Sequence, residues 1–324
     1  MILNKQLLLN YSIERLDDIM VNEKKVSIFD QINKNRISSM LLILIVAAVF
    51  FGIIYVIIQL FTAGASIGLL AFAGIFIIIY TVATYSYGDK VVLAATGAKE
   101  VKDDDRGYMH LINAVDGLSI AGGIPKPKIY VINSDEINAF ATGRDPKHAS
   151  IAVTRGALEN LDRDELEGVV GHELSHIGNY DIRFAMIVAV LVGLVAIISD
   201  MMLRSFWFGG VRSGGSDRDR GNVWIFVLIG LVLAIVAPIV VRLVQLAISR
   251  KREYLADATG AKLTRYPDGL ADALEKIKKY NTGKMKVSEA VSHLFIADPK
   301  KSFVDNIFAT HPNIDSRIKI LRAM

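Results

Sequence analysis

Four long apolar runs limit what this chain can fold into more than any other feature of its sequence. Each run has the length, about 20 residues, that a helix needs to cross the hydrocarbon core of a bilayer. Apart from Asp200 and Arg242, which lie near the ends of their runs, the runs carry no charge. Core helices of soluble proteins are rarely this long and this apolar, so we expect four membrane-spanning helices. The runs are Ile37–Phe61, Ser66–Tyr87, Phe184–Leu203 and Val223–Leu246.

Three polar segments remain around these runs. Together they hold enough residues for one compact domain of ordinary size. We therefore expect a polar extension at 1–36 and a first membrane hairpin at 37–87. One part of a folded domain follows at 88–183, then a second hairpin at 184–246, and the other part of the domain at 247–324.

Basic residues lie on both sides of the first hairpin, whereas the short turn within it carries no charge. Positively charged flanks favour the cytoplasm, so this pattern places the N-terminal extension and the segment after the hairpin there. The loop at 204–222 in the second hairpin contains four arginines and weakly opposes the same rule. The basic flanking residues of the first hairpin are Lys24, Lys25, Lys34, Arg36, Lys90, Lys99, Lys102 and Arg106.

Charge and cysteine content exclude several classes of protein. A net charge of +4 is typical of a membrane protein anchored to anionic lipid, and no pattern indicates a nucleic-acid partner. The chain has no cysteine, which excludes disulfides, thiolate metal ligands and a cysteine nucleophile.

Between the two hairpins, the sequence predicts helices and short strands. Residues 143–146 have turn chemistry, and Asp162 with Glu165 forms a capping box that starts a helix. We expect this helix to continue through Tyr180 into the third apolar run. The other expected elements are a helix over 101–123 and strands at Pro127–Ile132, Ile137–Thr142 and Ser150–Val153.

The capped helix carries the pattern HExxH at His172, Glu173 and His176. Residues four apart share one face of a helix, so both imidazoles can bind a single zinc ion. Glu173 lies beside the first histidine and can act as the general base toward a water that the metal activates. The pentapeptide is also compatible with two ordinary polar histidines, but the helical context favours a metal site.

A zinc site of this type needs a third protein ligand and an open position. A metzincin would have glycine at 179 and histidine at 182, whereas this chain has Asn179 and Ile182. The best candidate ligand is Glu253, which shares a helix face with Asp257. One of these carboxylates can bind metal while the other orients a ligand histidine. Both must lie on the same side of the membrane as the HExxH helix, which makes the third and fourth runs a hairpin.

The segments HELSHIGNYD, SRKREYLADATGA, LFIADP and THPNIDSRI together resemble the M48 membrane metalloproteases, in particular the HtpX-type heat-shock protease subgroup. The resemblance covers about residues 38–324. It implies a mainly α fold, with four transmembrane helices and a gluzincin-like α+β zinc-protease domain that holds a small β-sheet. It also implies one Zn²⁺ per chain, held by His172, His176 and Glu253, with Glu173 as the base.

The resemblance implies supporting roles for three residues. Asp257 matches a family aspartate that contacts a metal ligand. His311 and Arg317 match a histidine and an arginine that face the metal, and His311 would stabilise the developing oxyanion. Where relatives often have a second proline after His311-Pro312, this chain has Asn313, which barely affects the expected role.

Residues Asn138–Gly143 match the edge strand of the family's active site, where an extended substrate would pair through its main chain. The resemblance thus implies Asn138, Ala139 and Phe140 as substrate-binding residues. Asn138 would also bind the substrate backbone with its side chain. The remaining histidines, His110 and His148 together with His293, match no ligand position, and we interpret them as structural or surface residues.

The leading functional hypothesis is a zinc endopeptidase of the cell membrane that degrades misfolded or damaged membrane proteins in a stress response. Its expected partners are protein substrates and the lipid bilayer, with no nucleic acid. The alternatives are a specific processing protease of the M48 type and, less favoured, a non-catalytic membrane scaffold. The scaffold should have lost a ligand or the base, yet His172, Glu173, His176 and Glu253 are all present.

Overall fold

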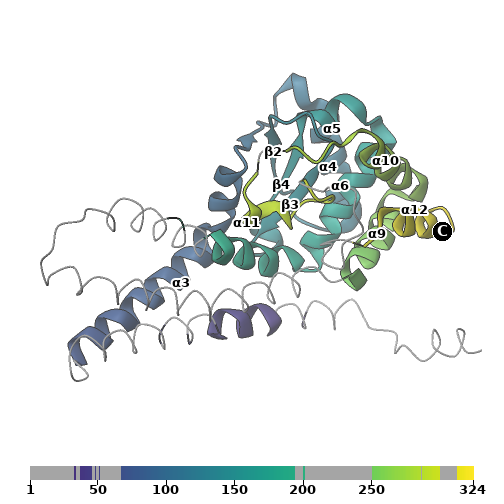
Figure 1. Ribbon diagram of the computed structural model, residues 1–324. Coiled ribbons are helices and arrows are strands. Elements are labelled where there is room, and N and C mark those ends of the chain that lie inside the picture. Colours follow the sequence, from purple (N-terminus) through teal and green to yellow (C-terminus); the bar gives the residue numbers. More distant parts are fainter. Residues whose placement is uncertain are drawn as a thin grey trace, which may run out of the picture.

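The computed structural model describes residues 67–193, 250–285, 287–299 and 312–324, a short helix at 37–45, and the single residues 33, 48, 51 and 200. A four-stranded sheet lies among helices, and α3 extends away from it (Figure 1). The helices are α3 (Ile67–Ala95), α4 (Met109–Gly122), α5 (Arg155–Asn160), α6 (Arg163–Gly178), α9 (Arg250–Thr264), α10 (Pro267–Tyr280), α11 (Glu289–Ser292) and α12 (Ile314–Leu321).

The sheet has the order β1-β2-β4-β3, which places β3 at one edge. Strand β2 is parallel to β4, and β3 is antiparallel to β4, with Ala139 opposite Val153. The three expected strands are confirmed with small shifts in their ends. The strands are β1 (Lys99–Glu100), β2 (Lys128–Ile132), β3 (Ala139–Gly143) and β4 (Ala149–Thr154).

The helix expected over 101–123 begins later than predicted. Residues 99 and 100 form β1, and the N–H of Val101 donates to the carbonyl of Ile129, so the chain stays extended along β2. A 3₁₀ turn at Arg106–Tyr108 follows, capped by the side chain of Asp105, and α4 starts at Met109. Pairing with β2 therefore overrides the local helical pattern at 101–105.

The second apolar run forms α3, which continues beyond the expected end at Tyr87 to Ala95. Within the described part of the chain, one helix is long and apolar enough to cross a membrane, at Leu70–Ala95. The expectation of four such helices is not confirmed. The first run is described only at its start, the third only up to residue 193, and the fourth lies outside the described residues.

The start of α6 confirms the predicted capping box. The Asp162 carboxylate accepts from the N–H of Glu165 at 3.0 Å, and the Glu165 carboxylate accepts from the N–H of Asp162 at 2.7 Å. The prediction that this helix runs through Tyr180 is wrong. It ends at Gly178, and Tyr180 adopts a left-handed φ of 61° before a new helix occupies residues 181–193.

One hydrophobic core joins the parts of the chain on either side of residues 194–249. Its buried side chains include Ile151 of β4, Leu174 of α6, Leu270 of α10 and Leu321 of α12. A second cluster covers the opposite face of the sheet, where Phe140 meets Phe295. The two segments that carry the candidate ligands are therefore held together by shared burial, the main favourable term in folding.

Helices α6 and α9 approach each other closely because each has a glycine at the contact. A Cβ atom on Gly260 would lie 2.8 Å from the backbone nitrogen of His172 and 3.0 Å from the carbonyl carbon of Gly171. On α9, Glu253, Asp257 and Gly260 follow the i, i+4, i+7 spacing of one helix face. The glycine contact thus brings both carboxylates beside the HExxH residues.

We expect Gly260→Ala to force α9 away from α6 and to lower both stability and zinc affinity. Overpacking of a close contact typically costs about 1–3 kcal/mol. Thermal unfolding and metal content of the purified protein would measure the two effects. Gly117→Ala on α4 is the matched control, because a Cβ there meets nothing within 4 Å. Equal behaviour of the two variants would show that the close approach does not hold the site.

Candidate metal centre

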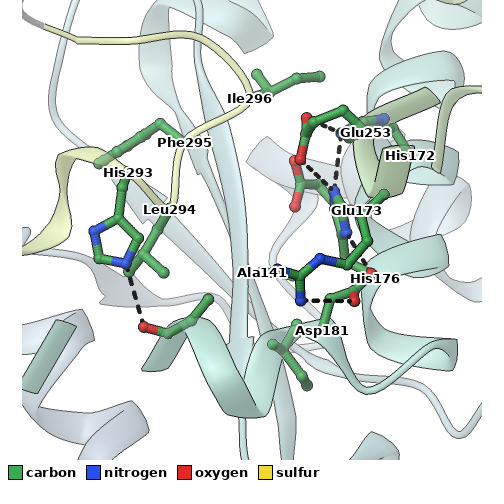
Figure 2. A pocket seen from close by; sticks show the side chains of 13 residues that line it. Ala141, His172, Glu173, His176, Asp181, Glu253, His293, Leu294, Phe295 and Ile296 are labelled. Carbon is green, nitrogen blue, oxygen red and sulfur yellow. Dashed lines mark hydrogen bonds and ion pairs between the residues drawn. The ribbon is translucent and has the colours of Figure 1, made fainter. Parts of the chain in front are cut away.

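Helices α6 and α9 bring three ligand-type side chains together, as Figure 2 shows. One ligand atom each from His172, His176 and Glu253 lies within 4.8 Å of the others. The two Nε2 atoms are 3.2 Å apart. Of the Glu253 carboxylate, Oε2 lies 3.8 Å from Nε2 of His172 and Oε1 lies 3.6 Å from Nε2 of His176. The structure thus brings together the three side chains that the sequence predicts as metal ligands.

These atoms fit a zinc ion in both chemistry and spacing. Two imidazole nitrogens and one carboxylate oxygen are the ligand set of many catalytic zinc sites. In a tetrahedral site with bonds of about 2.0–2.1 Å, ligand atoms are roughly 3.3 Å apart. The two imidazole nitrogens, 3.2 Å apart, are already close to that value. The Glu253 carboxylate faces both of them, with Oε2 3.8 Å from His172 and Oε1 3.6 Å from His176.

Asp257 and Arg317 orient His172 from the Nδ1 side of its ring. Nδ1 of His172 lies 2.9 Å from the Asp257 carboxylate, and Arg317 donates two hydrogen bonds of 2.7 and 2.8 Å to the same carboxylate. All three side chains are buried. Burial would raise the pKa of Asp257, but Arg317 and His172 outweigh it and lower this pKa to about 2. Asp257 is therefore an acceptor, which places the proton of neutral His172 on Nδ1 and leaves Nε2 available for metal.

Asp181 orients His176 as Asp257 orients His172, a role that was not predicted from the sequence. Its carboxylate lies 3.0 Å from Nδ1 of His176 and 3.6 Å from the Arg252 guanidinium. The left-handed turn at Tyr180 reverses the chain so that Asp181 lies beside the histidine five residues earlier. Burial opposes a charge on His176, but Asp181 and Glu253 outweigh it and raise the pKa of His176 to about 9. Without metal, this histidine therefore carries a proton that zinc must displace.

We expect Asp181→Ala to weaken zinc binding about 10- to 100-fold, the usual effect of losing a carboxylate behind a ligand histidine. Competition with a chromophoric chelator would measure the affinity. Asp181→Asn is the matched variant, because its amide oxygen can still accept from Nδ1, and it should lose less. If both variants bind zinc as tightly as the wild type, Asp181 does not support the ligand.

The candidate base, Glu173, faces the same cavity and is 2% exposed. Burial raises its pKa to about 7, opposed by His176 and by a hydrogen bond from the backbone N–H of Ala141. A buried carboxylate with a pKa near neutrality is suited to accept a proton and return it. The structure thus brings the expected base together with the three ligand side chains.

The edge strand β3 presents alternate residues to the site. In an antiparallel pair, the backbone groups of successive residues point alternately to the partner strand and away from it. Ala139 and Ala141 point away from β4, as their bonds to Ile296 and Glu173 show. Phe140 lies opposite Ala152 of β4, and its side chain is buried against Phe295. Ala141, which belongs to the matched strand but not to the expected substrate-binding residues, lines the cavity beside the metal centre.

Asn138 is in the expected place but is engaged with the protein itself. It is 1% exposed, its Nδ2 donates to the carbonyl of Ala297, and its Oδ1 accepts from the N–H groups of Ala139 and Ala297. Arg317 also reaches the site, where it donates to Asp257 and to the carbonyl of Ile296. His311 lies outside the described residues.

A small cavity of about 40 Å³ lies between the metal centre and the segment that contains residues 293–296. Figure 2 shows this segment opposite His172, His176 and Glu253. His293, which we interpreted as a structural or surface residue, lines the cavity, and its Nε2 lies 3.3 Å from the carbonyl oxygen of Ala185. Leu294, Phe295 and Ile296 complete this wall.

The site holds two histidines and a glutamate around one point, with a buried second glutamate and an edge strand beside them. This arrangement defines the class of metalloproteases with an HExxH helix and a glutamate as third ligand. The sequence profile of peptidase family M48 matches residues 106–324. The chain therefore belongs to peptidase family M48 and is a metalloprotease.

Relatives support the same family over most of the chain. A protein named "Protease HtpX homolog" from Caldanaerobacter subterraneus subsp. tengcongensis is 43% identical over 93% of this chain and 99% of the relative. One from Dictyoglomus thermophilum is 42% identical over 93% of this chain and 96% of the relative.

Among solved structures, the crystal structure of S. mikatae Ste24p matches with a TM-score of 0.46 and 19% identity, over 97% of this chain and 74% of that chain.

Proposed function

We propose that this protein is a zinc endopeptidase that cleaves misfolded or damaged membrane proteins at the surface of the cell membrane. The observation that carries the proposal is the position of the outward edge of β3 beside the metal centre. The carbonyl of Ala139 and the N–H of Ala141 point outward from the sheet, where they bond to Ile296 and Glu173. An extended backbone that replaced these partners would pair with both groups, with little regard to its side chains. Only unfolded segments are extended and free to pair, so this edge would bind unfolded substrates in preference to folded ones.

The proposed mechanism uses the chain's own groups as follows. Zinc, when bound, would supply a Lewis acid that polarises the peptide carbonyl and lowers the pKa of water. Glu173 takes a proton from the attacking water and returns it to the leaving amine. Asp257 and Asp181 hold the imidazoles of His172 and His176 through Nδ1, so that Nε2 of each ring would be the atom that binds the metal. Arg317 keeps Asp257 ionised, and His311 would stabilise the oxyanion.

We further propose that the protein crosses the membrane several times, with its N-terminus and catalytic domain in the cytoplasm. Support comes from α3, whose apolar side chains such as Phe72, Phe76 and Ile79 are exposed. The basic residues at both ends of the first predicted hairpin support the cytoplasmic orientation. Protease protection of tagged loops in inverted and right-side-out vesicles would test it.

The substrate proposal can be tested in proteoliposomes that hold the purified protease with one model membrane protein. We would compare a stable substrate with a destabilised point variant of the same sequence length. Cleavage should be much faster for the destabilised form, should be lost with a chelator, and should return with added zinc. Equal cleavage of both forms at one site would favour a specific processing protease and overturn the quality-control proposal.

The raised pKa of Glu173 predicts the acid limb of the pH profile. A general base works as the carboxylate, so activity falls as the pH drops through its pKa. In the metal-free protein this pKa is about 7, against 4.5 for an ordinary glutamate, and a bound cation would draw it down. We therefore expect kcat/KM for a peptide to fall with a midpoint between these two values. A limb at or below 4.5 would show that burial does not tune the base.

A further inference from the structure

The residues Leu294–Ala297, here called the cover segment, lie along the outward edge of β3. The N–H of Ile296 donates to the carbonyl of Ala139 at 2.9 Å. Ala297 pairs with the side chain of Asn138 through both its N–H (3.3 Å) and its carbonyl (2.8 Å). Residue 296 thus meets 139 and residue 297 meets 138, so the cover segment runs antiparallel to β3. An added β-strand would make the same kind of contact.

The cover segment is also attached to the metal centre. Arg317 donates to the carbonyl of Ile296 at 3.2 Å while it holds Asp257, the partner of His172. Phe295 is fully buried, with its ring edge-on to Phe140 at 4.9 Å between centroids. The contacts therefore hold the segment at its backbone and at one large side chain.

With the cover segment in place, the metal centre opens onto a cavity of about 40 Å³. Each water molecule needs about 10–15 Å³ of such a cavity. The cavity therefore has room for about three water molecules, which is too little for a peptide chain between the cover segment and Glu173. A substrate that pairs with the carbonyl of Ala139 must also take the place of the Ile296 N–H.

We propose that the cover segment is an internal occupant of the substrate site, so that the described conformation is latent and an extended substrate replaces the segment on β3. This proposal rests on the proposed function, since it assumes that β3 is the substrate edge. Substrate binding then requires an open form. Its apparent dissociation constant is the intrinsic constant divided by the open fraction. Loosening the cover segment should therefore lower KM and leave kcat unchanged.

The kinetic test compares Ile296→Pro with Ile296→Val in the full-length, zinc-loaded protease. Proline has no N–H and cannot donate to Ala139, whereas valine keeps both the donor and an apolar side chain. One intramolecular hydrogen bond changes an equilibrium constant about two- to tenfold. We expect the proline variant to lower KM for a quenched fluorescent peptide by that factor, and the valine variant to match the wild type. A folded proline variant with unchanged KM would overturn the proposal.

A second measurement leaves the cover segment unaltered, so it stands even if the proline variant does not fold. Hydrogen exchange would be followed in Glu173→Gln, which should bind peptide without cleaving it. A saturating unstructured casein peptide should speed exchange in residues 294–299 and slow it in 139–143. If the wild type cleaves this peptide while the cover segment stays equally protected, the segment is a fixed wall and the latency proposal fails. If the wild type cleaves no peptide at all, the proposed function fails with it.

Discussion

Glu173→Gln should lower kcat by about 10²- to 10⁴-fold, the range that a general base contributes. Glutamine keeps the size of the side chain but cannot accept a proton at neutral pH. Glu173 is outside the three-atom ligand cluster, so the variant should bind zinc as the wild type does. Hydrolysis of unfolded casein, measured together with metal content, would separate loss of the base from loss of the metal.

The matched control for this variant is Glu167→Gln on the same helix. Glu167 pairs with Arg163 near the start of α6 and does not line the cavity. It should retain full activity. If Glu173→Gln were as active as the control, with or without added zinc, the general-base mechanism would have to be abandoned.

Glu253→Ala should remove zinc from the purified protein and abolish activity. It deletes one of three ligand side chains, and the effect should exceed the 10- to 100-fold loss expected for residues behind the ligands. Isothermal titration of the metal-free protein with zinc, followed by the casein assay, would measure both effects.

Glu159→Ala is a suitable control for the loss of a carboxylate. Glu159 is an exposed partner of Arg155 on α5, and exposed pairs of this kind contribute little. It should bind zinc with wild-type affinity. Retention of one tightly bound zinc by Glu253→Ala would falsify the assignment of Glu253 as the third ligand.

The parts of the site that could be predicted from sequence follow from local periodicity. The capping box of Asp162 and Glu165 marks the start of α6, and the i, i+4 spacing of His172 and His176 places both rings on one face. Glu253 and Asp257 share a face of α9 for the same reason. The chemistry of HExxH and the resemblance to M48 then indicated which of these side chains meet.

Predictions failed where a partner distant in the sequence decides the local structure. Pairing with β2 keeps Val101 extended, so the helix expected from 101 starts at Met109. Gly178 and Asn179 end α6 just before the break at Tyr180, but we interpreted them as part of one continuous helix. The sequence contained Asp181 within a recognised segment, but nothing in its spacing distinguished a partner of His176 from an ordinary surface carboxylate.

The sequence by itself determined the metalloprotease class, because HExxH needs only the regular geometry of one helix to form two ligands and a base. Only the tertiary structure decided that Gly260 lets α9 approach α6, that Asp181 rather than Asp257 supports His176, and that β3 is covered by the chain itself. The contact between Asn138 and Ala297 joins residues 159 positions apart. Contacts at such separations depend on how the whole core packs, and no local pattern of residues encodes them.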